Sequence, residues 1–131
     1  MVLKNSKLMT TPIAHRGLHG EEVPENSLLA FEKAIELGFP IEFDVRIIDD
    51  GNIVVFHDDR LGRLTDRDGY VASLTTSDLS EMHLSGSDQT IPTLEQVLEM
   101  VNGRVPLLIE IKTNTRKAYA VEAKTADILK S

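Results

Sequence analysis

Short apolar runs alternate with helix-like stretches along this chain, and the alternation constrains its fold more than any other feature. Residues 13–14 read as a short strand that ends at His15, and residues 24–40 contain a helix. Asn26 or Ser27 is the expected N-cap of that helix, and a glycine followed by a proline ends it. Strands that alternate with helices predict βα units and a mainly parallel sheet, which places the chain in the α/β class.

A pair of strands joined by a tight turn follows this helix. Apolar and polar side chains alternate over residues 41–48, so Glu42, Asp44 and Arg46 share the face opposite the apolar one. The residues Asp-Asp-Gly-Asn at 49–52 are typical of a turn, and a second apolar run comes directly after them. We therefore expect a β-hairpin here.

The rest of the chain continues the alternation after a long loop. Residues 58–73 are polar and rich in Gly and Asp, which predicts that loop. Two capping boxes then predict helices: Thr75…Asp78 opens a short one that runs through Leu79 and Met82, and Thr93…Gln96 opens a second. A buried strand that carries Glu110 and Lys112 on one side is expected next. A final helix is expected from about Lys117, with one stripe formed by Val121, Thr125, Ile128 and Leu129.

Length and composition exclude several classes of protein. The 131 residues suit one domain, and a net charge of −7 disfavours nucleic acid and anionic membranes as partners. There is no cysteine, which excludes disulfides and thiolate–metal sites. Neither a secretory leader nor a transmembrane segment is predicted, because no apolar run is long enough. The cytoplasm is therefore the expected location.

The acidic strand is the first candidate site. Glu42 and Asp44 are two residues apart, so in a strand they project the same way with Cα atoms roughly 7 Å apart. Two carboxylates in a largely apolar sheet require a positive partner. Arg46 could be that partner, or a hard divalent cation could be, with Glu110 as a third ligand. A solvated strand face is the alternative.

Two histidines and two cations form the rest of the candidate site. His15 and His57 each end an apolar run, and imidazole is the usual proton-transfer group at neutral pH. Arg16 could grip a phosphate in bidentate fashion or form an ordinary surface ion pair. Lys112 could neutralise Glu110 or reach a phosphoryl oxygen, and spacing does not choose between these roles. His19 and His83 have no comparable setting.

Six motifs in order resemble a known family. The segments "HRG", "PENS", "EFDV", "DDGNIVVFHDDRLGRLT", "IPTL" and "LLIEIK" are similar to the successive motifs of the glycerophosphodiester phosphodiesterase family, from about Ile13 to Lys112. The resemblance implies a TIM-barrel-type (β/α)8 fold and hydrolysis of glycerophosphodiesters to sn-glycerol 3-phosphate and an alcohol. It also implies site residues: His15 and His57 as the acid/base pair, Glu42, Asp44 and Glu110 as ligands of Ca²⁺ or Mg²⁺, and Arg16 and Lys112 as phosphate contacts.

The chain is short for the fold that this resemblance implies. A full barrel needs about 250 residues, so we expect residues 1–131 to form a partial catalytic domain, the first half of the barrel. An open parallel sheet exposes an edge and apolar faces. The chain could be truncated, be completed by another copy, or adopt a different compact fold. We expect association of copies to cover the edge.

Two other functions stay open from the sequence. A related phospholipase-type phosphodiesterase would share the barrel and the histidine pair, but the low aromatic content of 5% does not favour a membrane-binding patch. An inactive remnant would keep the cation site without turnover. The headgroup alcohol and the nucleophile, which is either water or the substrate's own glycerol hydroxyl, are not specified.

Overall fold

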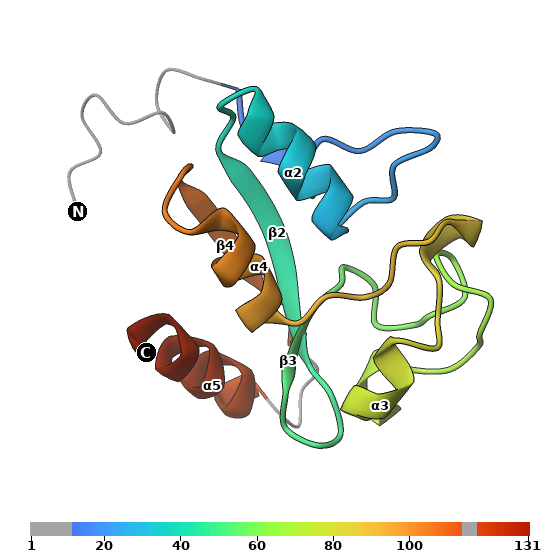
Figure 1. The fold of residues 1–131 in the computed structure, drawn as a ribbon. Coiled ribbons are helices and arrows are strands. Elements are labelled where there is room, and N and C mark those ends of the chain that lie inside the picture. The colour runs from blue at the N-terminus through green and yellow to red at the C-terminus, as the bar shows by residue number, and fades with distance from the viewer. Residues whose placement is uncertain (1–11, 114–117) are drawn as a thin grey trace.

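The structure is a computed structural model that describes residues 12–113 and 118–131 (Figure 1). Strands and helices alternate as the sequence predicts. In chain order the elements are β1 (Ala14–His15), α2 (Leu28–Glu36), β2 (Ile41–Ile47), β3 (Ile53–Val55), η1 (Val71–Ser73), α3 (Thr76–Leu79), η2 (Leu84–Gly86), α4 (Leu94–Val101), β4 (Leu107–Ile111) and α5 (Ala118–Lys130).

Strand β2 is the centre of the sheet. It pairs in parallel with β1 on one side and with β4 on the other, because Ile41 lies opposite both Ala14 and Leu107. β3 folds back on β2 as an antiparallel partner, so the predicted hairpin is confirmed. Three parallel strands therefore end at the same edge of the sheet, where β1 leads into a loop before α2 and β4 leads toward α5.

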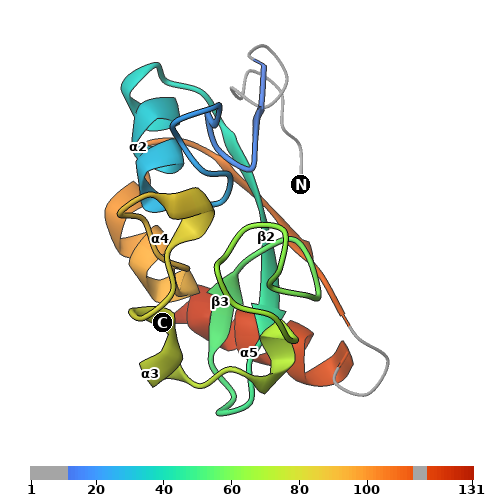
Figure 2. The ribbon, with the colours of Figure 1, turned by 90° about the vertical axis from the view of Figure 1, so that its right-hand side faces the viewer.

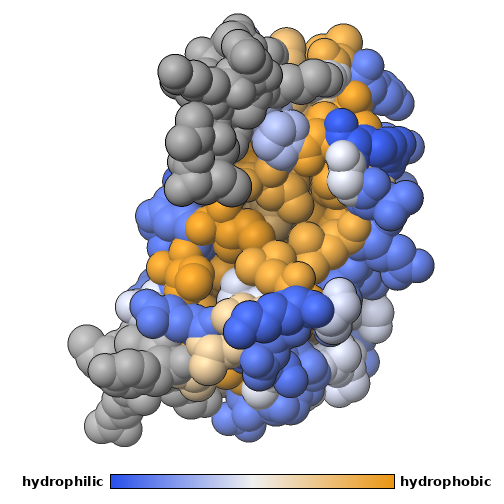
Figure 3. Space-filling view, turned by 90° about the vertical axis from the view of Figure 1, so that its left-hand side faces the viewer, coloured by the Kyte–Doolittle hydropathy of each residue, from blue (hydrophilic) through white to orange (hydrophobic). Residues whose placement is uncertain are grey.

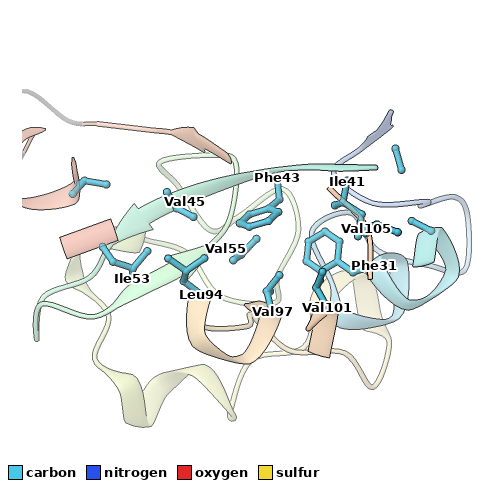
Figure 4. Close-up of a cluster of buried hydrophobic side chains, with 13 residues drawn as sticks. Phe31, Ile41, Phe43, Val45, Ile53, Val55, Leu94, Val97, Val101 and Val105 are labelled. Atoms are coloured by element: carbon cyan, nitrogen blue, oxygen red, sulfur yellow. The ribbon is translucent and has the colours of Figure 1, made fainter. Parts of the chain in front are cut away.

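One face of the sheet is covered by helices. Figure 2 shows α2 and α4 on the same side of β2, and the apolar side chains of β2 point toward them (Figure 4). Phe31 of α2 and Phe43 of β2 contact each other with ring centroids 5.6 Å apart, and both are fully buried. Burying such an aromatic side chain contributes about 2–3 kcal/mol. This core fixes which side of β2 is left for the polar residues.

The helix caps follow the predicted chemistry. Ser27, rather than Asn26, is the N-cap of α2, and its hydroxyl accepts from the backbone N–H of Ala30. Both predicted capping boxes are present, at Thr75 and Thr93. α3 ends at Leu79, before the predicted Met82. Met82 is nevertheless buried, in a second apolar cluster under the long loop.

β4 is less buried than predicted. None of its five residues is buried and Leu108 is 50% exposed, because β4 has β2 on one side and no strand on its outer edge among the described residues. Figure 3 shows a broad apolar area on the side of the molecule where this strand lies. The error arises because burial of a strand depends on its neighbours, which its own apolar residues do not specify.

The last helix departs from its predicted stripe. α5 begins at Ala118, and the predicted start at Lys117 lies outside the described residues. Val121 and Thr125 are buried, whereas Leu129 is 50% exposed. In the described part of the chain, no helix combines the length and apolarity that crossing a bilayer requires.

Candidate active site

Three carboxylates from two adjacent strands, β2 and β4, converge on one face of the sheet. Glu42 and Asp44 lie on the face of β2 opposite the core, and the parallel register places Glu110 of β4 beside Asp44. One oxygen from each of the three lies within 4.8 Å of the others. Glu42 and Asp44 are buried, while Glu110 is exposed. The structure thus brings together the trio that the sequence singled out.

Several buried oxygens in this cluster lack a donor. Oε1 of Glu42, Oδ1 of Asp44 and Oδ1 of Asn26 accept no hydrogen bond within the described residues. Buried acceptors without partners are rare and cost about 1–3 kcal/mol each. The Asn26 amide lies beside the carboxylates, because its Nδ2 donates to Oδ2 of Asp44 at 3.1 Å. Carboxylate and amide oxygens gathered in this way fit a hard divalent cation.

The electrostatics of the cluster also favour a bound cation. The pKa of Glu42 is raised above its ordinary value, chiefly because burial disfavours the charged form and also because Asp44 lies nearby. His15 offsets part of this shift, with its Nε2 3.1 Å from Oε2 of Glu42. A divalent cation between the carboxylates would remove the repulsion.

Arg16 is held at the rim of the carboxylate cluster by its backbone. Its φ of +59° lies in the left-handed region, which is uncommon for a residue other than glycine. Its N–H donates to the carbonyl of Glu42 at 2.8 Å, and its carbonyl accepts from the N–H of Asn26 at 2.8 Å. The guanidinium donates from Nη1 to Glu25, whereas the buried Nε–H makes no hydrogen bond among the described residues and lies 3.7 Å from Oδ2 of Asp44. An unpaired buried donor beside a cation site suits an anionic ligand.

The two candidate histidines lie in different settings. His15 ends β1, and its side chain is 64% exposed beside Glu42. His57 follows β3, and its Nδ1 lies 2.8 Å from Oδ1 of Asp58. Both are more accessible than the buried carboxylates, as groups that exchange protons with a substrate have to be.

Lys112 and Arg46 do not pair with Glu42 or Asp44. Lys112 donates to Oε1 of Glu110 at 2.7 Å, which is one of the two roles that the sequence left open. Arg46 does not lie between Glu42 and Asp44: its Nε and Nη2 donate to the carbonyl of His57 at 2.9 and 2.6 Å. The alternative in which Arg46 neutralises the carboxylates is therefore wrong, and the residue anchors the backbone of His57 instead.

Sequence reasoning missed three residues of this region, namely Glu25, Asp58 and Arg63. Arg63 donates to both carboxylates, and Asp58 in turn contacts His57. The pKa of Asp58 is lowered to about 2, mainly by the hydrogen bond from Arg63. All three lie in the quoted motifs, Glu25 in "PENS" and Asp58 and Arg63 in "DDGNIVVFHDDRLGRLT", but the only local signal for a role was that Asp58 follows a candidate histidine.

The loop beside Arg16 tolerates no side chain at its next residue. Gly17 has a φ of +80°, and a Cβ there would lie 2.7 Å from the Cβ of Ala30 and 2.9 Å from Cδ1 of Phe31. We expect Gly17→Ala to lower the free energy of unfolding by about 2–4 kcal/mol, because backbone strain and overpacking each cost about 1–3 kcal/mol. Chemical denaturation followed by circular dichroism measures this change.

A matched variant lies three residues further on. Gly20 has no heavy atom within 4 Å of a built Cβ. Gly20→Ala is therefore expected to change the free energy of unfolding by no more than about 0.5 kcal/mol. Equal stabilities of the two variants would contradict the close packing described for Gly17.

Comparisons with known proteins agree on one family. The model of the glycerophosphoryl diester phosphodiesterase family matches residues 15–131. A glycerophosphodiester phosphodiesterase from Bacillus altitudinis is 38% identical over 128 residues, which cover 91% of this chain and 52% of that protein. The chain spans about half the length of the curated relatives it matches.

Solved structures give the same result for the fold. A phosphodiesterase from Oleispira antarctica, solved in complex with the product sn-glycerol-3-phosphate, matches with a TM-score of 0.86 and 32% identity over 97% of this chain and 55% of that one. A glycerophosphodiester phosphodiesterase from Agrobacterium tumefaciens matches with a TM-score of 0.79 and 30% identity over 90% and 51% of the two chains. The predicted fold class, a TIM-barrel-type fold of which about half is present, is confirmed.

Proposed function

The chain belongs to the glycerophosphoryl diester phosphodiesterase family, and from this we propose that residues 1–131 form a partial catalytic domain for cation-dependent hydrolysis of glycerophosphodiesters. The products would be sn-glycerol 3-phosphate and an alcohol. The product complex of the Oleispira antarctica relative supports this choice of substrate class. A cytoplasmic location stays a prediction.

One observation carries the proposal. Buried oxygens without donors on Glu42, Asp44 and Asn26 gather beside the buried Nε–H of Arg16, which makes no hydrogen bond and lies 3.7 Å from Oδ2 of Asp44. The ion pairs of Arg16 with Glu25 and Asp44 leave these atoms without hydrogen bonds, and buried unpaired polar atoms are costly. A divalent cation together with a phosphodiester would satisfy both sets at once, since the cation takes the oxygens and the phosphate takes the N–H.

Glu42, Asp44 and Glu110 would hold the cation, which we propose to be Ca²⁺ or Mg²⁺. All three are oxygen ligands, which both of these hard cations prefer. When bound, such an ion offsets the charge that develops on the non-bridging phosphate oxygens. Arg16 and Lys112 would bind the same phosphate from the protein side, with the guanidinium offering two parallel donors where the ammonium offers a point charge.

His15 and His57 would move the protons. One imidazole takes a proton from the nucleophile as its oxygen bonds to phosphorus, and the other gives a proton to the alcohol oxygen as its bond to phosphorus breaks. The nucleophile is either water or the glycerol hydroxyl of the substrate. In the second case a cyclic phosphate forms first and is then opened by water.

A coupled assay for sn-glycerol 3-phosphate tests the proposal. The chain is incubated with glycerophosphocholine and either Ca²⁺ or Mg²⁺, with and without EDTA. Release that requires the cation supports the proposal, and release unaffected by EDTA contradicts the metal role. Absence of release with either ion, together with cation binding, would instead indicate a cation-binding remnant. Turnover of lysophospholipid alone would indicate the phospholipase-type alternative.

We also propose that two copies associate through β4. The outer edge of β4 has no partner strand among residues 12–113 and 118–131, Leu108 is half exposed, and the adjoining surface is apolar (Figure 3). In a two-fold symmetric dimer, the second copy would offer the same β4 edge as a partner. It would also bring the total length close to that of a relative, because this chain spans about half of one. Sedimentation equilibrium is expected to give the mass of a dimer.

The variants Leu108→Lys and Leu37→Lys separate this interface from general surface effects. Both positions are exposed, but Leu37 is the C-cap residue of α2 and is not part of β4. A lysine on the edge strand is expected to convert the dimer to a monomer, whereas Leu37→Lys leaves its mass unchanged. A compact, stable monomer of the unmodified chain would contradict the association.

A further inference from the structure

The guanidinium of Arg63 connects the loop before α2 to the long loop after β3. Glu25 belongs to the loop before α2, and Asp58 and Arg63 belong to the long loop after β3. Arg63 donates from Nη1 and Nη2 to the two oxygens of Glu25, at 2.9 Å each. It also donates from Nε and Nη2 to the two oxygens of Asp58, at 2.8 and 3.1 Å. We call these three residues the Glu25–Arg63–Asp58 bridge.

The bridge ends on both sides at groups of the active site. On one side, Oδ1 of Asp58 lies 2.8 Å from Nδ1 of His57. On the other side, Oε2 of Glu25 accepts from Nη1 of Arg16 at 3.0 Å. Glu25 is buried, with 8% of its side chain exposed, so it holds a fixed position between the two arginines. The candidate phosphate-binding residue and a candidate proton-transfer residue are therefore held by one network.

The bridge also determines which nitrogen of His57 carries the proton. An ionised carboxylate only accepts hydrogen bonds. Two donors of Arg63 keep Asp58 ionised, in line with its lowered pKa. Nδ1 of a neutral His57 must then be the donor in this contact, so the lone pair lies on Nε2, at the far side of the ring from Asp58.

We propose that Arg63 and Glu25 are positioning residues for His57. They hold Asp58 against Nδ1, so that His57 presents Nε2 to the substrate in one tautomer and one orientation, and Glu25 orients Arg16 at the same time. Neither residue touches the reacting atoms. This inference rests on the proposed phosphodiesterase function for its kinetic consequence, but the tautomer of His57 can be measured without any turnover.

The primary experiment is ¹⁵N NMR of the imidazole nitrogens in the full chain at a pH where His57 is neutral. The unmodified chain is expected to show a protonated Nδ1 and an unprotonated Nε2. In Arg63→Met, Asp58 loses its anchor, and the signals are expected to shift to a mixture of both tautomers. An unmodified chain that already shows a protonated Nε2, or an Arg63→Met variant with an unchanged tautomer, would overturn the proposal.

Two further variants make the test specific. Arg63→Lys keeps the charge but reaches only one of the two carboxylates, so it is expected to resemble Arg63→Met rather than the unmodified chain. Arg67→Met is the matched control, because Arg67 lies in the same loop but pairs with Asp78 and Glu81, outside the site. It is expected to leave the tautomer unchanged. A loss of the single tautomer in Arg67→Met would indicate a general loop effect and overturn the assigned role of Arg63.

Kinetics give the second readout. With glycerophosphocholine, Arg63→Met is expected to lower kcat by about 10–100-fold with little change in KM, because a misplaced catalytic group affects the reaction more than binding. Glu25→Gln is expected to raise KM as well, since Arg16 loses the negative charge of its hydrogen-bond partner. An unmodified chain without turnover would refute the proposed function, while the NMR result would still decide the role of the bridge.

Discussion

Replacing His57 by alanine is expected to lower kcat for glycerophosphocholine by about 10²–10⁴-fold, the contribution of a positioned acid or base. The side chain is partly exposed and its backbone carbonyl is held by Arg46, so the fold does not depend on the imidazole. Divalent cation binding, measured by calorimetry, is expected to persist. A rate near that of the unmodified chain would contradict the acid/base role.

His15→Ala is expected to cause a loss of the same order and to leave a functional cation site. His15 also contacts Glu42, so the variant's cation affinity can change modestly through that carboxylate, whereas kcat should fall at saturating cation. His19→Ala and His83→Ala are matched controls, because both side chains are exposed and lie outside the candidate site. Their rates are expected to equal that of the unmodified chain.

Replacing Asp44 by asparagine is expected to lower the affinity for Ca²⁺ or Mg²⁺ by at least about 10²-fold, since even the outer partners of metal ligands contribute 10–100-fold. Asp44 is fully buried at the centre of the carboxylate cluster. In the unmodified chain, a cation at about 100 times its Kd adds about 2.7 kcal/mol of stability, which raises Tm by several degrees. Asp44→Asn is expected to lose this rise in Tm, whereas Asp49→Asn, at an exposed aspartate, is expected to keep it.

When EDTA removes the cation, we expect the carboxylate cluster to lower the stability of the chain rather than raise it. Because the folded-state pKa of Glu42 is raised, the native chain holds its proton more tightly than the unfolded chain does. Stability is therefore lost as the pH rises from the unfolded value through the folded one, and the penalty grows with pH over that range. Glu42→Gln removes it and is expected to raise Tm at pH 7 but not near pH 4. A variant less stable than the unmodified chain at pH 7 in EDTA would show that no such penalty exists.

Local sequence patterns were sufficient to predict the elements whose stabilising hydrogen bonds come from residues close by in the chain. Ser27, Thr75 and Thr93 cap helices with their own following residues, and the turn at 49–52 forms within a hairpin. Alternation along β2 likewise predicted which side chains face the core, because strand periodicity is a property of the backbone. The exposure of β4 was predicted wrongly, because it depends on strands that lie beside it rather than on its own residues.

By itself, the sequence determined the α/β class, the resemblance to the family and the set of candidate site residues. Only the tertiary structure decided which charges meet: parallel register brought Glu110 to Asp44, and loop packing brought Arg63, 38 residues away in sequence, to Glu25. The physical reason is that helix caps, tight turns and apolar periodicity act over a few residues along the chain. Contacts between side chains from different loops depend instead on how the whole chain packs.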